Sequence, residues 1–540
     1  KFAENEVTNI RRYIENQQNP QKLGRGAPFE FSTSDPIKDF DKEDLWALEN
    51  LRLMHTLKVD PHNGFILFEN LYQKSTGEYE FSNRQAILHV MGKNVELLSE
   101  KEKLKFDIYK AHSYSETGKP QNAYDLLSKY KSPDNVDLAI KVQLLIILGN
   151  CATRLGRIDE AERFLSESLD LSISSNDAAL RGKSELALGS LRQLQGRWNQ
   201  ANKLYLSALK YCFQVEDLVN AGILLNSIGY IHCLKGDYIS GRNSCSQALD
   251  IFEKISRLRE KAMVFSTLGE IYTASEQFEE AMRNYSQAME AVEVRKDWEW
   301  ICILKYQVAH SLWVQNKYEE ALKYIRESLN IAETHNLWKE FPNIYYHLGW
   351  IAWDHSKFVS LGDQEYELSV SNFKKSYDES IKYQDKFLQL SNLVALAEIA
   401  AIFGKNDLIP LYAKELKEEI KAGNLEYPLL QGQMERIQGN IDYDLAQTQN
   451  DLALYTKSLR HYIISIPLIS KHGGTGRYSL VNELLFLGDR IDDLDAQIAI
   501  VWCVEMRTQW GKKHEVISKH PELLNFCNVH LALAKSRLKE

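Results

Sequence analysis

The chain has 540 residues, of which 26% are charged and 44% hydrophobic, and its formal net charge is −9. The apolar share is large enough for an extensive buried core, but no apolar run is long enough to span a bilayer, so we expect no membrane association. An acidic chain is also poorly suited to the phosphate backbone, and we expect no direct nucleic-acid binding.

The seven cysteines are odd in number, and no CxxC pair occurs among them. Most of them fall within helical patterns, where a free thiol packs as a small apolar side chain. This usage favours reduced cysteines in a cytoplasmic protein over disulfides or a zinc site.

In chain order, residues 1–36 are predicted to be a tether, because their second half is rich in Gly, Pro and Ser. Residues 37–100 are predicted to form degenerate helical hairpins. The segment DKEDLWALENLRLM predicts a helix with acidic residues in its first turn. Two capping boxes, Ser82-x-x-Gln85 and Ser99-x-x-Glu102, are predicted to open two further helices.

Residues 101–465 contain a repeat. A small residue recurs every 40 positions, at Gly149, Gly189, Gly229, Gly269, Ala309 and Gly349. A second small residue follows twelve positions later, as at Ala161 and Gly241, and a bulky one such as Tyr205 follows that after four more. Small residues at helical spacing let two helices approach closely, and the bulky side chain fills the remaining space. Each unit is therefore predicted to be a helix hairpin, with a turn glycine at Gly156, Gly196 and Gly236 in three copies.

The pattern is predicted to continue with lower fidelity. Ala397 follows Gly349 by 48 residues, so eight residues are inserted, and we expect them in a longer loop at 358–369. Residues 466–540 lose the register but keep helical periodicity, which predicts capping helices. The glycine-rich segment Gly473–Arg477 is either a flexible turn or, as the less favoured alternative, an anion site at a helix start.

The spaced small and aromatic residues resemble the tetratricopeptide repeat over roughly residues 100–465. The 40-residue period departs from the usual period of about 34, and the terminal proline of the motif is missing from most copies. The resemblance implies an all-α fold, a right-handed α-solenoid of helix hairpins. Long-period arrays resemble the sensor arms of STAND-type signal-transduction ATPases and maltotriose-type activators. They also resemble the partner-binding arrays of spindle-orientation adaptors and kinesin light chains.

The same resemblance implies that the first helix of each hairpin lines a concave binding face. At the lining offsets stand Asn226, Tyr230, Tyr306, Gln307, His310, Trp313, Tyr346, His347, Trp350, Trp353, Arg436, Asn440 and Tyr443, with Tyr109, His112, Asn150 and Arg154 in the amino-terminal half. The stretch from Tyr306 to Trp353 is rich in rings with polar tips, which binding surfaces favour. If the register is shifted by one, these rings pack between helices instead. Replacing Trp350 and Trp353 with alanine is predicted to abolish binding and to leave the helical content intact.

No P-loop, HExxH or GxSxG motif occurs, and no catalytic set of residues is identifiable. We therefore expect no enzyme, no cofactor and no metal site, but an array that binds a protein or peptide segment or a small polar or aromatic ligand. The leading hypothesis is the sensing arm of a larger signalling protein with an attached NTPase or effector domain, because Lys1 is not an initiator methionine and a tether follows it. The alternatives are a stand-alone scaffold and a substrate-carrying enzyme subunit.

Overall fold

The computed structural model describes residues 42–78, 80–130, 137–359, 363–403, 405, 407–423, 427–471 and 480–539. Within these ranges the secondary structure is helical throughout and contains no strand, which confirms the all-α solenoid of helix hairpins. No helix in this part of the chain is long and apolar enough to cross a membrane. The expected tether at 1–36 and the glycine-rich turn at 473–477 lie outside the described residues.

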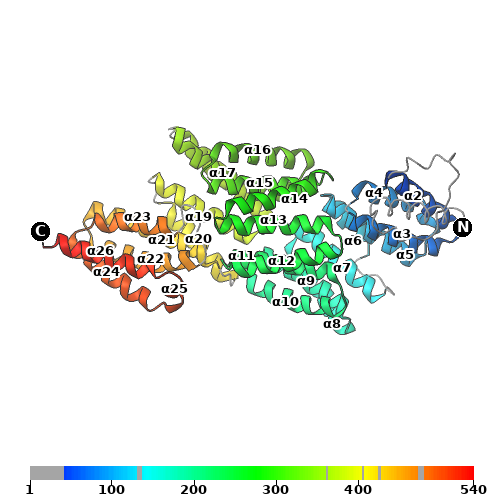
Figure 1. Cartoon of the computed structure of the whole chain (residues 1–540), viewed down its shortest axis with the longest axis horizontal. Helices are drawn as coiled ribbons and strands as arrows, with labels where there is room; N and C mark the ends of the chain where they lie inside the picture. Colours follow the sequence, from blue (N-terminus) through cyan, green and yellow to red (C-terminus); the bar gives the residue numbers. More distant parts are fainter. Residues whose placement is uncertain are drawn as a thin grey trace, which may run out of the picture.

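The amino-terminal unit lies at one end of the elongated molecule (Figure 1). Its elements are α2 (Lys42–Val59), α3 (Pro61–Gly77), α4 (Phe81–Lys93), η3 (Val95–Leu97), α5 (Glu100–Glu116) and α6 (Pro120–Ser128). The capping box at Ser99 is confirmed, because its side chain and that of Glu102 each bond the other residue's backbone N–H. The capping box at Ser82 is wrong: α4 begins one residue earlier, with Glu80 as its N-cap, so Ser82 is already helical.

The next ten helices form five hairpins with a constant period. They are α7 (Leu138–Arg154), α8 (Ile158–Ser175), α9 (Ala178–Leu194), α10 (Trp198–Gln214), α11 (Leu218–Leu234), α12 (Tyr238–Lys254), α13 (Leu258–Ala274), α14 (Phe278–Glu293), α15 (Trp298–Val314) and α16 (Tyr318–His335). The first helices of successive hairpins begin 40 residues apart, as predicted. Most of these first helices begin where an aspartate such as Asp177 accepts a backbone N–H of the first turn.

The small residues of the repeat are required by close helix packing. A Cβ atom added at Gly189 would lie 2.5 Å from the ring of Tyr205, and one added at Gly269 would lie 2.3 Å from the ring of Tyr285. Both tyrosines are almost fully buried in the second helix of the same hairpin. The predicted pairing of a small residue with a bulky partner is therefore confirmed.

The remaining elements carry the chain to the opposite end of the molecule. They are η4 (Trp338–Glu340), α17 (Phe341–Val359), α18 (Asp363–Lys382), α19 (Lys386–Ile402), α20 (Ile409–Gly423), α21 (Pro428–Gln449), α22 (Leu452–Lys471), α23 (Leu480–Asp492), α24 (Ala496–Gly511), α25 (His514–Lys519) and α26 (Glu522–Arg537). The loop predicted at 358–369 is wrong, because α17 continues to Val359 and α18 already begins at Asp363. The extra residues lengthen helices, since Gln, Glu and Leu in this stretch are good helix formers.

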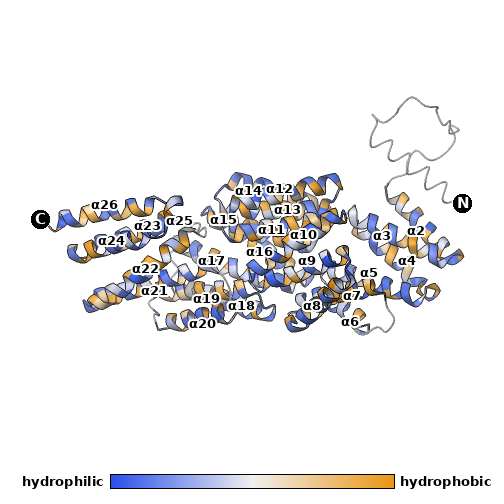
Figure 2. Ribbon diagram, turned by 90° about the horizontal axis from the view of Figure 1, so that it is seen from below, coloured by the Kyte–Doolittle hydropathy of each residue, from blue (hydrophilic) through white to orange (hydrophobic). Residues whose placement is uncertain are grey.

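The array curls until distant hairpins touch. The ring of Trp198 in α10 packs against Phe387 of α19 and Tyr427, with centroids 5.6 and 4.8 Å apart, and one hydrophobic core joins α10 and α11 to α19, α20 and α21. In Figures 1 and 2, α19 and α20 accordingly lie beside the earlier hairpins. A Cβ at Gly156 would lie 1.8 Å from the carbonyl oxygen of Lys382, so the approach needs a glycine there. As a result, every residue from Leu388 to Ala400 is buried, although α19 is a first helix of the solenoid.

Candidate functional site

The first helices α11, α13, α15 and α17 carry a continuous set of polar and aromatic side chains on their inner face. We name this set the inner cluster; it consists of Tyr230, Glu270, Tyr306, Gln307, His310 and His347. Burial raises the pKa of the Tyr230 hydroxyl on α11, and the nearby carboxyl groups of Glu270 and of Asp385, the N-cap residue of α19, add to this rise. The inner cluster therefore faces the interior of the curled array, where α19 lies opposite.

Rings from α15 and α17 form a row within the inner cluster. The rings of Tyr306 and His347 are nearly parallel, with centroids 5.9 Å apart, and His347 lies 4.9 Å from His310. His310 in turn contacts Trp313 at 5.7 Å. All four residues are only partly accessible to solvent. Rings held in this way offer a large contact area at little cost in conformational entropy.

Both histidines in the row are neutral near neutral pH. Burial lowers the pKa of His310 to about 4, and burial together with His310 lowers the pKa of His347 well below its ordinary value. The Nδ1 atom of His347 is buried and has no hydrogen-bond partner among the described residues. A neutral imidazole can act as a hydrogen-bond donor or acceptor, but this nitrogen is enclosed by the protein, so a ligand meets the ring and not Nδ1.

Glu270 gives the inner cluster a carboxyl group beside which the described residues place no cation. Burial raises its pKa to about 7, and its partner is the side-chain amide of Gln307. Gln307 is itself held by the Ser266 hydroxyl, which donates to its Oε1 at 2.7 Å. Glu270 is not among the residues predicted from the sequence, although it follows Gly269 directly, at the same repeat position as Tyr230 and His310. The position directly after the small residue of each repeat therefore predicts this residue as well.

Further carboxyl groups adjoin the inner cluster. Tyr306 donates a hydrogen bond of 3.3 Å to Glu340, and burial raises the pKa of both Glu340 and Asp385. The nearby cations are Lys339, which acts on both carboxyl groups, and Arg154, which forms a 2.7 Å ion pair with Glu299. The interior is therefore rich in carboxyl groups that burial penalises when they are charged.

The tryptophans predicted to be exposed on the binding face are buried instead. Trp350 and Trp353 are 4% and 5% exposed and pack with Phe373 and residues of α19. The reason is that the next helices along the chain, α18 and α19, stack directly on this part of α17, so these rings pack between helices. Trp313 lies against Trp350 and donates from Nε1 to Asp354 at 2.8 Å, while Tyr346 contacts His347 and Phe373. The alanine test of the two tryptophans is thus unsuitable, because it removes core packing.

The three candidates on α21 lie away from the inner cluster. Arg436 forms ion pairs with Glu398 at 3.5 Å and Glu483 at 3.3 Å, and Asn440 accepts a hydrogen bond from the Tyr462 hydroxyl. Tyr443 is fully buried, and its hydroxyl donates to a backbone carbonyl at 2.7 Å. The prediction that Tyr443 lies on an open binding face is therefore wrong, because this residue belongs to the core of the carboxy-terminal helices.

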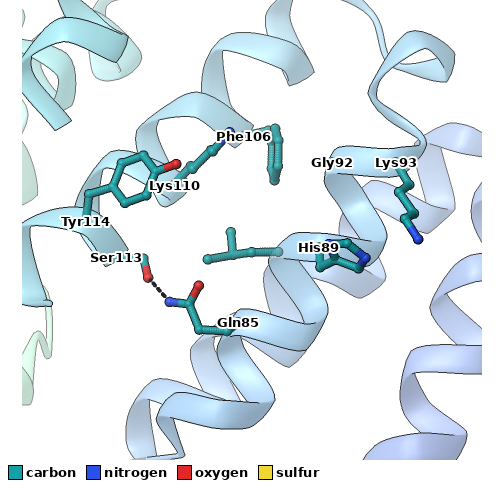
Figure 3. A pocket seen from close by; sticks show the side chains of 9 residues that line it. Gln85, His89, Gly92, Lys93, Phe106, Lys110, Ser113 and Tyr114 are labelled. Atoms are coloured by element: carbon teal, nitrogen blue, oxygen red, sulfur yellow. Dashed lines mark hydrogen bonds between the residues drawn. The ribbon is translucent and has the colours of Figure 1, made fainter. Parts of the chain in front are cut away.

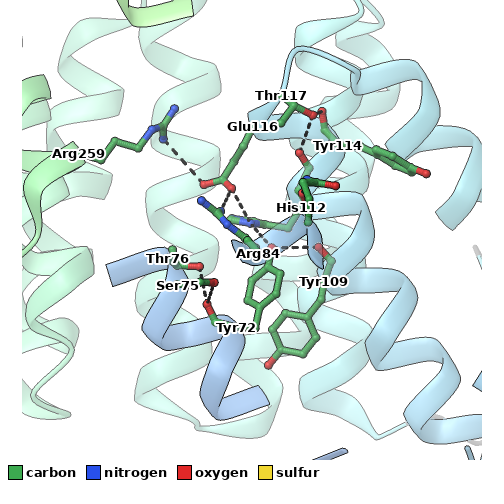
Figure 4. Close-up of polar contacts among 12 residues, drawn as sticks. Tyr72, Ser75, Thr76, Arg84, Tyr109, His112, Tyr114, Glu116, Thr117 and Arg259 are labelled. Carbon is green, nitrogen blue, oxygen red and sulfur yellow. Dashed lines mark hydrogen bonds and ion pairs between the residues drawn. The ribbon is translucent and has the colours of Figure 1, made fainter. Parts of the chain in front are cut away.

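The amino-terminal candidates Tyr109 and His112 belong to a polar junction instead (Figure 4). There Glu116 of α5 pairs with Arg84 of α4 and, at 3.9 Å, with Arg259 of α13. His112 lies 3.7 Å from the same carboxylate. This junction fastens the amino-terminal unit to the repeat array. The two remaining candidates differ in exposure: Asn226 is half-buried and Asn150 is exposed.

Among the described residues, no group of three or more His, Cys, Asp or Glu side chains is arranged to hold a metal ion. All seven cysteines are free thiols, and burial raises the pKa of Cys245 in the array to about 12. The thiols therefore carry little of the reactive thiolate.

The family profile described as tetratricopeptide repeat matches residues 142–212 and 220–293. A search of curated proteins found no match. Among solved structures, a Rap protein complexed with competence and sporulation factor is 16% identical over 68% of this chain and 98% of its own, with a TM-score of 0.49. A STAND protein with a tetratricopeptide repeat sensor from Pyrococcus horikoshii is 16% identical over 66% of this chain and 56% of its own, with a TM-score of 0.41. The human IFIT1 dimer with PPP-AAAA is 12% identical over 84% of this chain and 94% of its own, with a TM-score of 0.43.

Proposed function

Since the chain carries a tetratricopeptide-repeat array, we propose that it is a non-enzymatic recognition module whose inner cluster binds a peptide segment with basic and aromatic side chains. The observation that carries this proposal is the combination of a carboxyl group without a neighbouring cation among the described residues, Glu270, with a row of partly accessible rings. A small polar or aromatic ligand is the alternative guest for the same surface.

The charge of the site favours a basic guest. A lysine or arginine side chain beside Glu270 supplies the cation that the described residues do not place there, and it also favours the charged forms of Glu340 and Asp385. The faces of Tyr230 and Tyr306 attract the same cation through their ring quadrupoles. An acidic guest meets repulsion from the same three carboxyl groups.

The rings favour an aromatic or apolar side chain next to the basic one. Tyr306, His347 and His310 lie in one row and are already held by neighbouring rings, so they lose little freedom when a guest covers them.

We further propose that this array is the sensing arm of a larger signalling protein. The curled array holds two contact regions that are distant in sequence, α10 with α19 and Arg154 with Glu299. If the distance between these regions differs between two conformations of the array, a guest that binds one conformation more tightly shifts the array toward it. Because repeats contact mainly their neighbours, a small rotation at each one adds up to a displacement at the ends. A scaffold that only docks segments has no need of such a change.

The binding proposal is tested by panning a random peptide library against the full chain. We expect enrichment of sequences that combine Lys or Arg with aromatic residues. Glu270→Gln and His347→Ala are each expected to weaken the selected peptides roughly tenfold, which corresponds to about 1.4 kcal/mol. Glu290→Gln removes the same charge from the exposed surface of α14 and is expected to have no effect. Enrichment of acidic peptides, or equal binding by all three variants, contradicts the proposal.

The sensing proposal is tested by small-angle X-ray scattering of the full chain with and without the selected peptide. A sensing arm is expected to change its radius of gyration when the peptide binds. An unchanged scattering curve at saturating peptide contradicts the sensing arm and supports the scaffold.

A further inference from the structure

A second candidate site lies outside the repeats that carry the inner cluster, in the amino-terminal unit. A pocket of about 550 Å³ opens between α4 and α5. Ligand pockets typically measure roughly 300–1,000 Å³, so this volume is sufficient for a small molecule. Its lining residues are Gln85, Leu88, His89, Gly92, Lys93, Phe106, Lys110, Ser113 and Tyr114. Figure 3 shows Gln85 of α4 pointing toward Ser113 of α5, while His89 and Lys93 lie farther along α4, near its end.

The pocket is positively charged in an acidic protein. Two lysines and a histidine line it, and no carboxylate does. Lys110 extends over the ring of Tyr114, 5.9 Å from its centroid, and neither Lys93 nor Lys110 has a carboxylate partner in the described part of the chain. Other lysines on this unit are paired, as Lys105 is with Glu69 at 3.2 Å. Unpaired ammonium groups on either side of a pocket favour an anion between them.

The walls of the pocket are aromatic and apolar. Phe106 and Leu88 are 3% and 7% exposed, so the core holds both side chains in place and only an edge of each reaches the pocket. The floor is tied by the Gln85 side-chain amide, which donates to the Ser113 hydroxyl at 2.7 Å and links α4 to α5 (Figure 3). A flat ring can lie against these surfaces, and the polar floor offers it hydrogen bonds.

Gly92 keeps the pocket open. A Cβ atom added there would have a single neighbour within 4 Å, the Cζ atom of Phe106 at 3.8 Å. Because Gly92 is helical and any residue fits its backbone, a larger side chain at this position enters the pocket without straining α4.

We propose that this pocket binds a small molecule in which a flat ring carries a phosphate group, of about mononucleotide size. The phosphate dianion lies between Lys93 and Lys110, and the ring lies against Phe106 and Leu88. Two ammonium groups match the double negative charge of a phosphate better than the single charge of a carboxylate. This site is independent of the inner cluster, so either proposal stands if the other fails.

Isothermal titration calorimetry of the full chain with adenosine monophosphate, adenosine and inorganic phosphate tests the proposal. We expect saturable binding of the monophosphate and at least roughly tenfold weaker binding of adenosine and of phosphate alone, since each lacks half of the contacts. Lys93→Gln and Lys110→Gln are each expected to weaken the monophosphate roughly fivefold to tenfold. Gly92→Leu is expected to abolish its binding.

Lys103→Gln is the matched control, because Lys103 is also on α5 but pairs with Glu100 at 2.9 Å and does not line the pocket. It is expected to bind like the unaltered chain. Absence of saturable monophosphate binding overturns the proposal, as does binding that survives both lysine substitutions or the Gly92→Leu substitution. Because both lysines are at the surface of the pocket, their replacement keeps the test valid even if Gly92→Leu disturbs folding. Adenosine that binds as well as the monophosphate refutes the role of the phosphate.

Discussion

Replacing Glu270 with glutamine is expected to stabilise the protein in a pH-dependent way. Burial raises the pKa of this carboxyl group in the folded chain to about 7, from an ordinary value of 4.5. Between these two values the folded chain binds more protons than the unfolded chain, so the free energy of unfolding falls as the pH rises. Below the lower value both states are protonated, and above the upper value both are ionised, so the effect is constant there. Glutamine has the same shape and no charge, and it keeps the contact with Gln307.

The magnitude follows from the difference of about 2.5 pH units between those two pKa values. At ~1.36 kcal/mol per unit this difference amounts to about 3 kcal/mol, which is an upper bound. The side chain of Glu270 is half-buried, and solvent that reaches it screens part of the charge. We therefore expect Glu270→Gln to raise the free energy of unfolding by about 1–2 kcal/mol above about pH 7.5 and by almost nothing near pH 4.5.

The assay compares urea unfolding midpoints of the unaltered chain and Glu270→Gln between about pH 4.5 and pH 8.5. Glu340 and Asp385, whose pKa values are also raised, titrate in both proteins and cancel in the difference. Glu290→Gln on α14 serves as the control and is expected to shift the midpoint equally at every pH. A difference between the unaltered chain and Glu270→Gln that is independent of pH refutes the reasoning, and so does a variant less stable than the unaltered chain above pH 7.5.

Three further predictions concern the fold. Gly156→Ala is expected to lower stability by at least about 2 kcal/mol, because its φ of +72° and the carbonyl oxygen of Lys382 leave no room for a Cβ atom. Gly511→Ala, where a Cβ atom meets nothing within 4 Å, is the matched control in thermal unfolding, and equal melting temperatures refute the close contact. Cys245 is expected to react with iodoacetamide near pH 8 far more slowly than an exposed cysteine, because its pKa is raised to about 12; rapid alkylation of the folded chain, read by mass spectrometry, contradicts its burial. Ser99→Ala is expected to cost about 1 kcal/mol through loss of its cap, seen as faster hydrogen exchange at the start of α5, and unchanged exchange there argues against the capping box.

The local structure of this protein follows from short-range sequence patterns. The 40-residue spacing of small residues predicted where each hairpin begins, because close packing of two helices needs a small residue at the contact. Gly156 and its counterparts predicted the turns, because a left-handed residue ends a helix most easily when it is glycine. The capping box failed at Ser82 because a serine three residues before a glutamine occurs inside helices as well as at their starts.

The candidate site could be predicted only in part. Fixed offsets from the small residues found Tyr306, His310 and His347, which the structure joins in one row. The same offsets predicted that Trp350 would be exposed, and it is buried. An offset within one repeat identifies the face of a helix, but it does not say what lies opposite that face.

What lies opposite is decided by tertiary structure alone. Small rotations between neighbouring repeats accumulate over several hairpins until α10 meets α19, and no local pattern encodes their sum. That contact completes the burial of α19 from Leu388 to Ala400, whereas Trp350 is covered by α18 and α19, the next helices along the chain. Tertiary packing also buries Glu270 and raises its pKa, because a carboxyl group loses hydration when neighbouring helices surround it. The sequence by itself therefore determined the hairpins and their period, whereas the curling of the array determined which residues of the inner face remain open to a ligand.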